Sequence, residues 1–343
     1  MSRNIIYVTH AEKGPSGGAK IIYRHSEIIN DIKNFSSEVL HLRKRRFSKL
    51  KISINKRLKL NINDESGWQF SQIEGIKNFS YSWLQHKIRI KSNLNFDSKR
   101  DFVILPEIFA HLAEEMLVKK KIKYAIFVQN GYALNSTNNE TKLATAYSKA
   151  KFILSYSDDI TNCVKIKFPK LKTKIIKISY SLDLNYKKKT NKKNMITYMS
   201  RKLPQHSSLV TNYIKNYLPK NWTLTDINHS SENITYLSLR KSKIFLAFSN
   251  LEGLPLPPAE AALAGNFVIG YTGEGGDEYW KKPIFTKINS GEIKTFVKEI
   301  LKKISDIKKG KKISENQLNN LKEKFSKKRE LTNIKNFLKY TNK

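Results

Sequence analysis

Two glutamates of this sequence, Glu252 and Glu260, have types and a spacing that suit a binding site. They lie eight positions apart in the string EGLPLPPAEAALAG. Glu252 stands in a Gly- and Pro-rich loop, and we expect Glu260 in the first turn of a helix that begins near Pro258. The N-terminus of a helix offers free N–H groups and a positive dipole end to an anion. The segment therefore predicts an anion-binding site beside two carboxylates.

Two pairs of glycines lie where the backbone has room to approach a ligand. Gly275–Gly276 follows the apolar run at 267–271, and Gly17–Gly18 follows the apolar run at 5–9. Glycine lacks a Cβ, so its N–H group can come close to a phosphate or a sugar. An ordinary strand-to-helix turn explains the same residues, most readily at Gly17–Gly18. The glycines alone therefore do not distinguish a ligand-binding loop from a plain turn.

The first half of the chain alternates between short apolar runs and helical periodicity, which predicts a parallel α/β sheet. Pro106–Glu107 and Gln129–Asn130 each end an expected strand, so we expect both to line a ligand cleft. The expected helices are 19–33 and 107–121, and the expected strands are 5–9, 37–41, 102–105, 124–128, 152–154 and 174–178.

The second half repeats the pattern after a polar, Lys-rich linker at 185–194. The expected helices are 207–217 and 258–263, and the expected strands are 195–199, 222–225, 244–247 and 267–271. We expect a first domain over 1–184, a second over 195–328, and a C-terminal helix over 329–343 that crosses back to the first domain. Two such α/β domains would place a cleft at the carboxyl ends of both sheets.

The spacing of Glu252 and Glu260 matches the E-x7-E motif of retaining GT-B glycosyltransferases, and the chain most resembles glycosyltransferase family 4. The resemblance implies two Rossmann-like domains facing each other across a cleft. It implies that Glu252 contacts the donor sugar and that Glu260 holds the ribose hydroxyls of the nucleotide. A carboxylate suits a vicinal diol because its two oxygens can accept two O–H bonds.

Further positions match the family in chain order. Arg201 resembles the arginine that neutralises the donor diphosphate, and Gly275–Gly276 with Glu278 resembles the glycine pair and later glutamate of the donor site. Gly17–Gly18 resembles the N-terminal glycine loop, which faces the diphosphate in the family. Preorganised charges of this kind stabilise a departing diphosphate without a metal.

The sequence departs from the family pattern at two places. The family has a lysine about five residues after the arginine, whereas His206 stands here, and Lys202 is the other residue that could serve. Many members have a histidine where this chain has Gln129–Asn130, whose amides can bond a sugar hydroxyl and do not titrate near neutral pH. This departure keeps a catalytically inactive GT-B-like domain and a sugar epimerase as alternatives.

The expected site residues form two groups. We expect catalytic roles for Glu252, Arg201, Gln129 and Asn130. We expect donor binding by Glu260, Lys202, His206, Gly17, Gly18, Gly275, Gly276 and Glu278, with no metal and no cofactor besides the nucleotide-sugar substrate. His111 is expected to be structural, and His10 stays open between core and cleft.

Composition narrows the class of protein. One cysteine, Cys163, in 343 residues rules out a disulfide framework and a CxxC metal site, and an apolar fraction of 39% can support buried cores. The apolar run at 5–8 fits a strand better than a signal peptide, so we expect a cytoplasmic protein. The formal net charge of +35 has three possible explanations. They are a Lys-rich sequence from an AT-rich genome, attraction to an anionic membrane surface and attraction to nucleic acid.

The expected function is transfer of a hexose from a nucleotide-diphosphate sugar to a glycan or lipid-linked acceptor, with retention of configuration. Surface polysaccharide or lipopolysaccharide biosynthesis is the expected pathway. A basic nucleic-acid-binding protein is the alternative from another class. It explains the charge but neither Glu252 and Glu260 nor the glycine pairs, and zinc ligands and an aromatic RNP strand are absent from the sequence. We therefore expect no nucleic-acid partner.

A basic insertion at 43–61 interrupts the first domain. It contains nine Lys or Arg residues and no acid, with apolar residues interspersed. Such a segment can rest on an anionic leaflet, so we expect a peripheral location on the inner face of a membrane. A solvated Lys-rich loop explains the same composition.

Overall fold

The computed structural model describes residues 2–12, 14, 16–44, 69–82, 84, 86–182, 191–228 and 230–342. The chain forms two compact units, each built on its own sheet. Unit 1 comprises Met1–Tyr156, Ile160–Ile178 and Leu331–Lys343, and unit 2 comprises Ser157–Asp159 and Ser179–Glu330. Most of the expected linker at 185–194 and most of the expected insertion at 43–61 lie outside the described residues.

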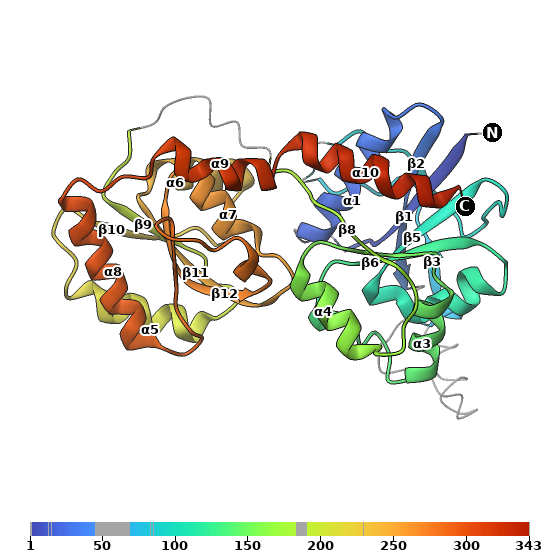
Figure 1. Ribbon diagram of the computed structural model, residues 1–343, viewed down its shortest axis with the longest axis horizontal. Helices are drawn as coiled ribbons and strands as arrows, with labels where there is room; N and C mark the ends of the chain where they lie inside the picture. The colour runs from blue at the N-terminus through green and yellow to red at the C-terminus, as the bar shows by residue number, and fades with distance from the viewer. Residues whose placement is uncertain are drawn as a thin grey trace. The chain divides into compact units, whose positions relative to one another are not determined.

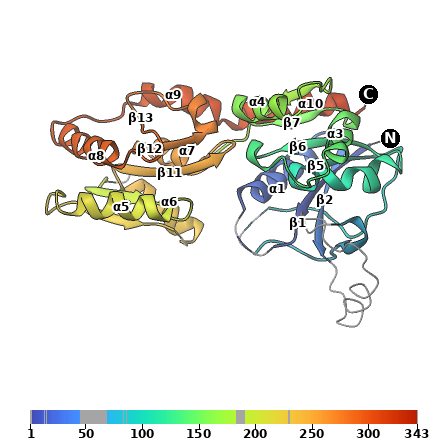
Figure 2. The same ribbon diagram turned by 90° about the horizontal axis from the view of Figure 1, so that it is seen from below.

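Unit 1 contains a mixed sheet in the order β3-β2-β1-β5-β6-β7-β8, with β4 paired to β2. Every pairing is parallel except that of β2 with β3. Figure 2 shows β7 and β2 toward opposite ends of this sheet. The strands are β1 (Arg3–His10), β2 (Phe35–Lys44), β3 (Ile73–Gly75), β4 (Ile90–Lys91), β5 (Asp101–Pro106), β6 (Lys123–Val128), β7 (Ile153–Ser155) and β8 (Ile175–Lys177).

The described helices of unit 1 cover this sheet. They are α1 (Gly17–Asn30), η1 (Phe70–Gln72), η2 (Glu107–Leu112), η3 (Glu114–Val118), η4 (Gly131–Ala133), α3 (Glu140–Lys149), α4 (Asp158–Lys167) and α10 (Lys327–Thr341). The single helix expected over 107–121 is wrong, because η2 is a 3₁₀ helix and η3 is a π-helix. Local hydrogen bonding decides between these helix types, and apolar spacing does not resolve it.

Unit 1 takes its last helix from the far end of the sequence. Phe337 and Leu338 of α10 are buried, and the Lys174 Nζ donates to the Tyr340 hydroxyl at 2.6 Å. The Arg3 guanidinium also donates to the Thr341 carbonyl at 2.5 Å. The first helix of unit 1 ends at Asn30 and the last begins at Lys327, and Figure 1 shows α10 in red beside the blue strands.

Unit 2 contains a fully parallel sheet in the order β10-β9-β11-β12-β13. In Figure 1, α5 lies below the strands of this sheet, α6 and α7 lie above them, and α8 lies at the left. The strands are β9 (Met195–Tyr198), β10 (Thr223–Asp226), β11 (Ile244–Glu252), β12 (Phe267–Glu274) and β13 (Phe285–Lys287). The helices are α5 (Pro204–Lys215), α6 (Glu232–Lys241), α7 (Leu256–Leu263), η5 (Gly275–Glu278), α8 (Ile293–Lys308) and α9 (Glu315–Lys324).

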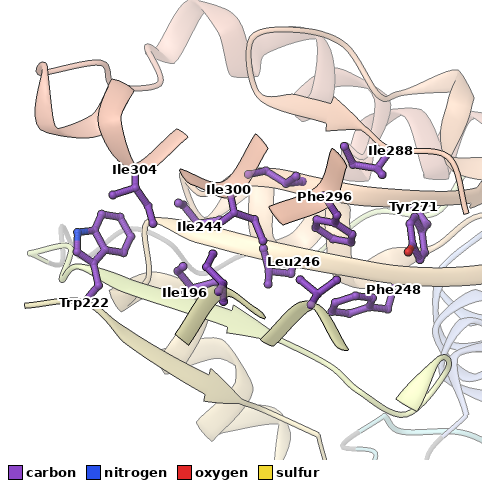
Figure 3. Packing of buried hydrophobic residues seen from close by; sticks show 13 residues of the cluster. Ile196, Trp222, Ile244, Leu246, Phe248, Tyr271, Ile288, Phe296, Ile300 and Ile304 are labelled. Carbon is purple, nitrogen blue, oxygen red and sulfur yellow. The ribbon is translucent and has the colours of Figure 1, made fainter. Parts of the chain in front are cut away.

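The core of unit 2 forms where α8 packs on the sheet. Phe296, Ile300 and Ile304 recur every four residues, so they share one helix face, and all three are buried. Figure 3 shows Phe296 beside Phe248 and Tyr271. Together with the sheet of unit 1, this doubly wound arrangement confirms the expected α/β class with two Rossmann-like sheets.

Among the described residues, no helix combines the length and the apolar character that crossing a bilayer requires.

Candidate active site

The carboxyl ends of β9 and β11 meet at the point where the strand order of unit 2 reverses. From β9 the chain goes to β10 on one side, and it then crosses back to β11 on the other side of β9. Ligands of open α/β sheets bind at such a point because the adjacent loops diverge there. Arg201 and Lys202 follow β9, and Glu252 ends β11. The Lys202 Nζ lies 3.9 Å from the Glu252 Oε1, so the topology brings these predicted residues together.

Opposing effects act on the Glu252 carboxylate. Burial raises the pKa of Glu252, while the charges of Lys202 and Arg201 lower it, and the net direction is upward. Both cations therefore lie close enough to act on this carboxylate. A bound anion that engages Arg201 and Lys202 would weaken their field at Glu252. Binding of such an anion and protonation of Glu252 are therefore coupled through the same two cations.

The ends of β11 and β12 are held in a strained and crowded arrangement. The pairing register shifts between Ser249 and Glu252, and Leu251 and Glu274 have positive φ values of 47° and 71°. Leu251 is also 50% exposed, so much of this apolar residue faces solvent. Such strain costs on the order of 1–3 kcal/mol per residue and collects at functional sites.

The glycine pair after β12 is required by close packing inside the protein. A Cβ on Gly275 would lie 1.8 Å from the Gly253 carbonyl oxygen, so no other residue fits there without a backbone shift. A Cβ on Gly276 would lie 3.0 Å from the Trp280 Nε1. The Ser157 hydroxyl also donates to the Gly253 carbonyl at 2.6 Å. The two loops therefore form one rigid unit, and this packing explains the glycines without a ligand.

Glu260 lies on α7, and its expected place in the first turn is wrong. The helix begins at Leu256, so Glu260 is the fifth helical residue. Two of the first three helical residues are prolines, Pro257 and Pro258, which have no N–H group. The N-terminus of α7 therefore offers fewer donors to an anion than the sequence suggested.

Three predicted carboxylates gather around one buried tyrosine. Tyr279 is fully buried, and the charges of Glu252, Glu260 and Glu278 add to burial in raising its pKa. The Tyr279 hydroxyl donates to the Pro255 carbonyl at 2.7 Å, which fixes the loop between Glu252 and α7. The E-x7-E residues thus lie within electrostatic reach of the same side chain.

Glu278 is already engaged by the protein. One carboxylate oxygen accepts the backbone N–H of Asp158 at 2.8 Å, and the other pairs with the Lys324 ammonium. The side chain is 13% exposed. These contacts tie η5 to the 157–159 segment and to the end of α9. The expected donor-binding role of Glu278 stays a prediction.

His206 occupies the first turn of α5, directly after the loop that carries Arg201 and Lys202. Its Nδ1 lies 3.2 Å from the Tyr271 hydroxyl, and the two rings make an edge contact. The Nδ1 atom is therefore used within the protein, and any contact with a ligand falls to the Nε2 atom.

The glycine loop of unit 1 is held by Gln129. Gly17 and Gly18 begin α1, whose N-cap Ser16 accepts the N–H of Ala19 at 3.3 Å. The Gln129 Nε2 donates to the Gly18 carbonyl at 3.1 Å, and a Cβ on Gly18 would lie 2.3 Å from the Gln129 Oε1. Glycine is thus needed so that the amide can close against the backbone.

A buried carboxylate positions Gln129 and Asn130 in turn. The two Glu107 oxygens accept the N–H groups of Gln129 at 3.0 Å and of Asn130 at 2.9 Å. Burial raises the pKa of Glu107 to about 7, against the effect of these hydrogen bonds, which lower it. The Asn130 side chain then accepts the N–H of Tyr132 and so caps η4. Three predicted residues, Gly18, Gln129 and Asn130, therefore form one hydrogen-bonded group with Glu107.

His111, which was expected to be structural, and His10, which the sequence left open, differ in their surroundings. His111 is 1% exposed on η2, as expected of a structural residue. His10 ends β1, where its Nδ1 accepts the N–H of Glu12 at 3.3 Å and burial lowers its pKa.

Solved structures align with the whole chain. TarM is 11% identical with a TM-score of 0.65 and covers 100% of this chain and 99% of its own. HepE from Anabaena in complex with UDP is 10% identical with a TM-score of 0.62, covering 98% and 99%. Sucrose-phosphate synthase from Thermosynechococcus elongatus is 7% identical with a TM-score of 0.63, covering 98% of both chains. These are GT-B structures.

The chain has the GT-B fold. The sequence itself matches no protein-family model and no curated protein. The resemblance drawn from Glu252, Glu260 and the glycine pairs therefore agrees with the fold.

Several residues around Glu252, Glu260 and Glu278 were not assigned a role from the sequence. They are Tyr279 and Tyr180, both fully buried beside the three glutamates, with Ser157 and Lys324. Tyr279 follows Glu278 directly, so the segment itself was visible. Its contacts with Pro255 and the glutamates depend on tertiary packing, which spacing does not show. Within the described part of the chain, no group of three or more His, Cys, Asp or Glu residues is arranged to hold a metal ion.

Proposed function

We propose that this GT-B protein is a glycosyltransferase that uses a nucleotide-diphosphate sugar as donor. The observation that carries the proposal is the meeting of Arg201, Lys202 and Glu252 at the strand-order reversal of unit 2, with Glu260 nearby on α7. Cations beside carboxylates match the chemistry of the donor, since the diphosphate is anionic and the sugars carry hydroxyls. The complex of HepE with UDP supports this choice of ligand class.

The reaction needs help mainly at the leaving group. Charge grows on the diphosphate as the bond to the sugar breaks, and Arg201 and Lys202 stabilise that charge in this proposal. Removing one such preorganised contact typically lowers the rate on the order of 10²–10³-fold. Glu252 contacts the donor sugar and Glu260 accepts hydrogen bonds from the ribose hydroxyls. Neither a metal nor a separate nucleophile is required, and the configuration at the sugar is retained.

Unit 1 provides the acceptor side in this proposal. Gln129 and Asn130 bond sugar hydroxyls through their amides, and Gly17–Gly18 approaches the donor phosphates. The hydrogen bonds from Gln129 and Asn130 to the Glu107 carboxylate support these roles, because they hold the backbone of both residues in place. The acceptor is a glycan or a lipid-linked glycan, and the sugar is a hexose. The complex of a TarM variant from S. aureus with UDP and α-GlcNAc-glycerol is consistent with a glycosylated acceptor class.

The pathway proposed is biosynthesis of surface polysaccharide or lipopolysaccharide, in the cytoplasm or on the inner face of a membrane. The family resemblance and the basic character of the chain, with a formal net charge of +35, support this location.

A thermal-shift screen with UDP, GDP, ADP, TDP and CMP sugars identifies the donor. A ligand at 100 times its Kd adds about 2.7 kcal/mol of stability. With the donor known, Glu260→Ala should weaken nucleotide binding, whereas Glu252→Ala should lower turnover with little loss of nucleotide affinity. Glu299→Ala on α8 is the matched control, because in the described structure Glu299 pairs with Lys302 on the same helix.

The comparison of these three variants decides the proposal. If Glu252→Ala and Glu260→Ala bind and turn over like Glu299→Ala, the assigned roles are wrong. Activity should also survive EDTA, and its complete loss with recovery on adding Mn²⁺ would contradict the metal-independent mechanism.

A further inference from the structure

A cavity of about 430 Å³ lies in unit 2 at the edge of the sheet opposite Glu252. Lys243 directly precedes β11 and Phe267 begins β12, and both line the cavity. Glu252 ends β11 nine residues after Lys243, which in an extended strand is about 30 Å away. The cavity is therefore separate from the proposed donor site.

The described lining of this cavity combines apolar residues with five cationic side chains. They come from the segment before β9, from α6, from the start of β11 and from the loop after α8. These cations are Lys192, Arg240, Lys243, Lys311 and Lys312, and Glu315 is the acid among the described lining residues.

Lys192 is a partly buried cation whose partners in the described structure are backbone carbonyls. Its Nζ donates to the Ser242 carbonyl at 2.6 Å and to the Leu239 carbonyl at 3.4 Å. An ammonium has three N–H groups, so these bonds do not exhaust its capacity. Burial lowers the pKa of Lys192 to about 7, and no carboxylate counteracts this effect. An anion in the cavity would supply the counter-charge that this partly buried ammonium lacks here.

The wall around Lys192 is rigid. Gly265 has a φ of +81°, and a Cβ there would lie 3.3 Å from the Lys192 Cε, so glycine leaves room for the lysine stem. The buried Asn266 side chain donates to the Leu239 carbonyl at 2.7 Å and accepts the Ser242 hydroxyl at 2.7 Å. Both residues that bond Lys192 are thus fixed by a second layer of hydrogen bonds.

The other charges leave the cavity positive. Lys311 pairs with Asp306 at 2.9 Å and Glu315 pairs with Lys322, so these two lining charges are largely compensated. The Lys243 Nζ instead donates to the Asn194 side-chain carbonyl at 2.7 Å. The Arg240 guanidinium lies 5.4 Å from the centre of the Tyr236 ring. In the described part of the chain, these two cations, like Lys192, contact neutral groups.

We propose that this cavity binds a small phosphate-bearing anion, with Lys192, Arg240 and Lys243 as its cationic contacts. A phosphate group carries more than one negative charge, which matches several cations that have neutral partners. A guanidinium can also hold phosphate oxygens through two parallel N–H bonds. The cavity volume accommodates a pyrophosphate or a phosphorylated metabolite, and the site is independent of the donor-sugar role proposed above.

Lysine labelling resolved by peptide tests this proposal on the full chain. The protein is acylated briefly at pH 7.5 with or without inorganic pyrophosphate, and sodium chloride keeps the ionic strength equal. We expect pyrophosphate to reduce labelling of Lys192 and Lys243 several-fold. Labelling of Lys287, which pairs with Asp277 on the surface away from the cavity lining, should not change.

Two variants separate this cavity from the donor site, to which pyrophosphate should also bind. Protection of Lys192 should persist in Arg201→Ala and fall in Arg240→Ala. Equal labelling with and without pyrophosphate in the parent would overturn the proposal, and so would protection lost in Arg201→Ala but kept in Arg240→Ala. Circular dichroism of both variants verifies that they are folded.

A lipid headgroup is a second possible source of a phosphate group. The labelling experiment is therefore repeated with vesicles of phosphatidic acid. We expect no protection of Lys192 by vesicles, because a cavity suits a soluble ligand. Protection by vesicles and not by pyrophosphate would overturn the assignment to a soluble anion.

Discussion

The carboxyl group of Glu107 shows how one buried side chain can set the position of a whole loop. As a carboxylate it accepts two backbone N–H groups, those of Gln129 and Asn130. As a neutral acid it retains only one good acceptor toward them and presents an O–H to the other. Because burial holds its pKa at about 7, both forms are populated near neutral pH.

The pH dependence of stability tests this description of Glu107. The pKa is about 7 in the folded protein and 4.5 in the unfolded chain, so the folded state binds more protons between these values. The free energy of unfolding therefore falls as pH rises from 4.5 to 7, by on the order of 3 kcal/mol from this group. Glu107→Gln, which cannot titrate, should remove this part of the slope. Urea unfolding of parent and variant at pH 5 and pH 8 measures it, and identical slopes would contradict it.

At the residue scale, the sequence predicted which residues belong to the candidate site, but for several of them it did not show why they are needed. Arg201, Glu252 and Glu260 could be predicted because their types and spacing are local properties. The need for glycine at position 275 could not be predicted, because the Gly253 carbonyl is what excludes a Cβ there. Likewise the position of Glu107 at a strand end was visible, but its two hydrogen bonds come from a segment more than twenty residues away.

At the scale of elements, α8 shows how a helix is seated on a sheet. Phe296 packs over Gly270, where a Cβ would lie 2.8 Å from the Phe296 ring and 2.1 Å from the Ala247 carbonyl oxygen. The ring also contacts Phe248 and Tyr271, with ring centres 5.2 and 5.4 Å apart. The absence of a side chain at one strand position therefore lets the helix approach the strands closely.

Truncation of this ring should destabilise unit 2 without touching the proposed site residues. Phe296→Ala removes a fully buried ring, which typically costs about 3–5 kcal/mol of unfolding free energy. Lys298→Ala on the same helix is the control and should change stability by less than about 0.5 kcal/mol. Chemical denaturation measures both, and similar midpoints for the two variants would refute the packing argument.

Element boundaries were predictable where apolar runs are continuous and unpredictable where hydrogen bonding decides. Strands β1, β5 and β6 lie within one or two residues of their apolar runs, because both faces of these strands are buried. The region 107–121 has helical periodicity but forms a 3₁₀ and a π segment. Helix α7 begins at Leu256, two residues before the expected start near Pro258.

At the scale of the whole molecule, the net charge of +35 favours contact with anionic surfaces. The basic insertion expected at 43–61 begins two residues inside β2, and Arg43 already pairs with Glu74 at 2.6 Å. A test of membrane binding that changes Lys44, Arg45 and Arg46 therefore leaves the ion pair between Arg43 and Glu74 in place.

Replacement of these three residues by Ser should reduce binding to anionic vesicles, because each Lys or Arg near the surface contributes about 1 kcal/mol. Co-sedimentation with anionic and neutral liposomes at low and high salt measures this. The matched control removes the same charge at three exposed lysines of unit 1, Lys149, Lys151 and Lys170. Equal losses in both triple variants would show that total charge matters and that this segment has no special role.

Helix α10 comes from the C-terminal part of the sequence but packs in unit 1, and this affects the order in which the units fold during translation. Phe152 packs against Phe337 and Tyr340 of that helix, with ring centres 6.2 and 6.1 Å apart. The ribosome releases the strands of unit 1 first, and it delivers α10 only after all of unit 2 has been synthesised. During that interval part of the apolar surface of unit 1 stays uncovered. We expect unit 1, which emerges first during translation, to complete its folding last, after unit 2 has folded.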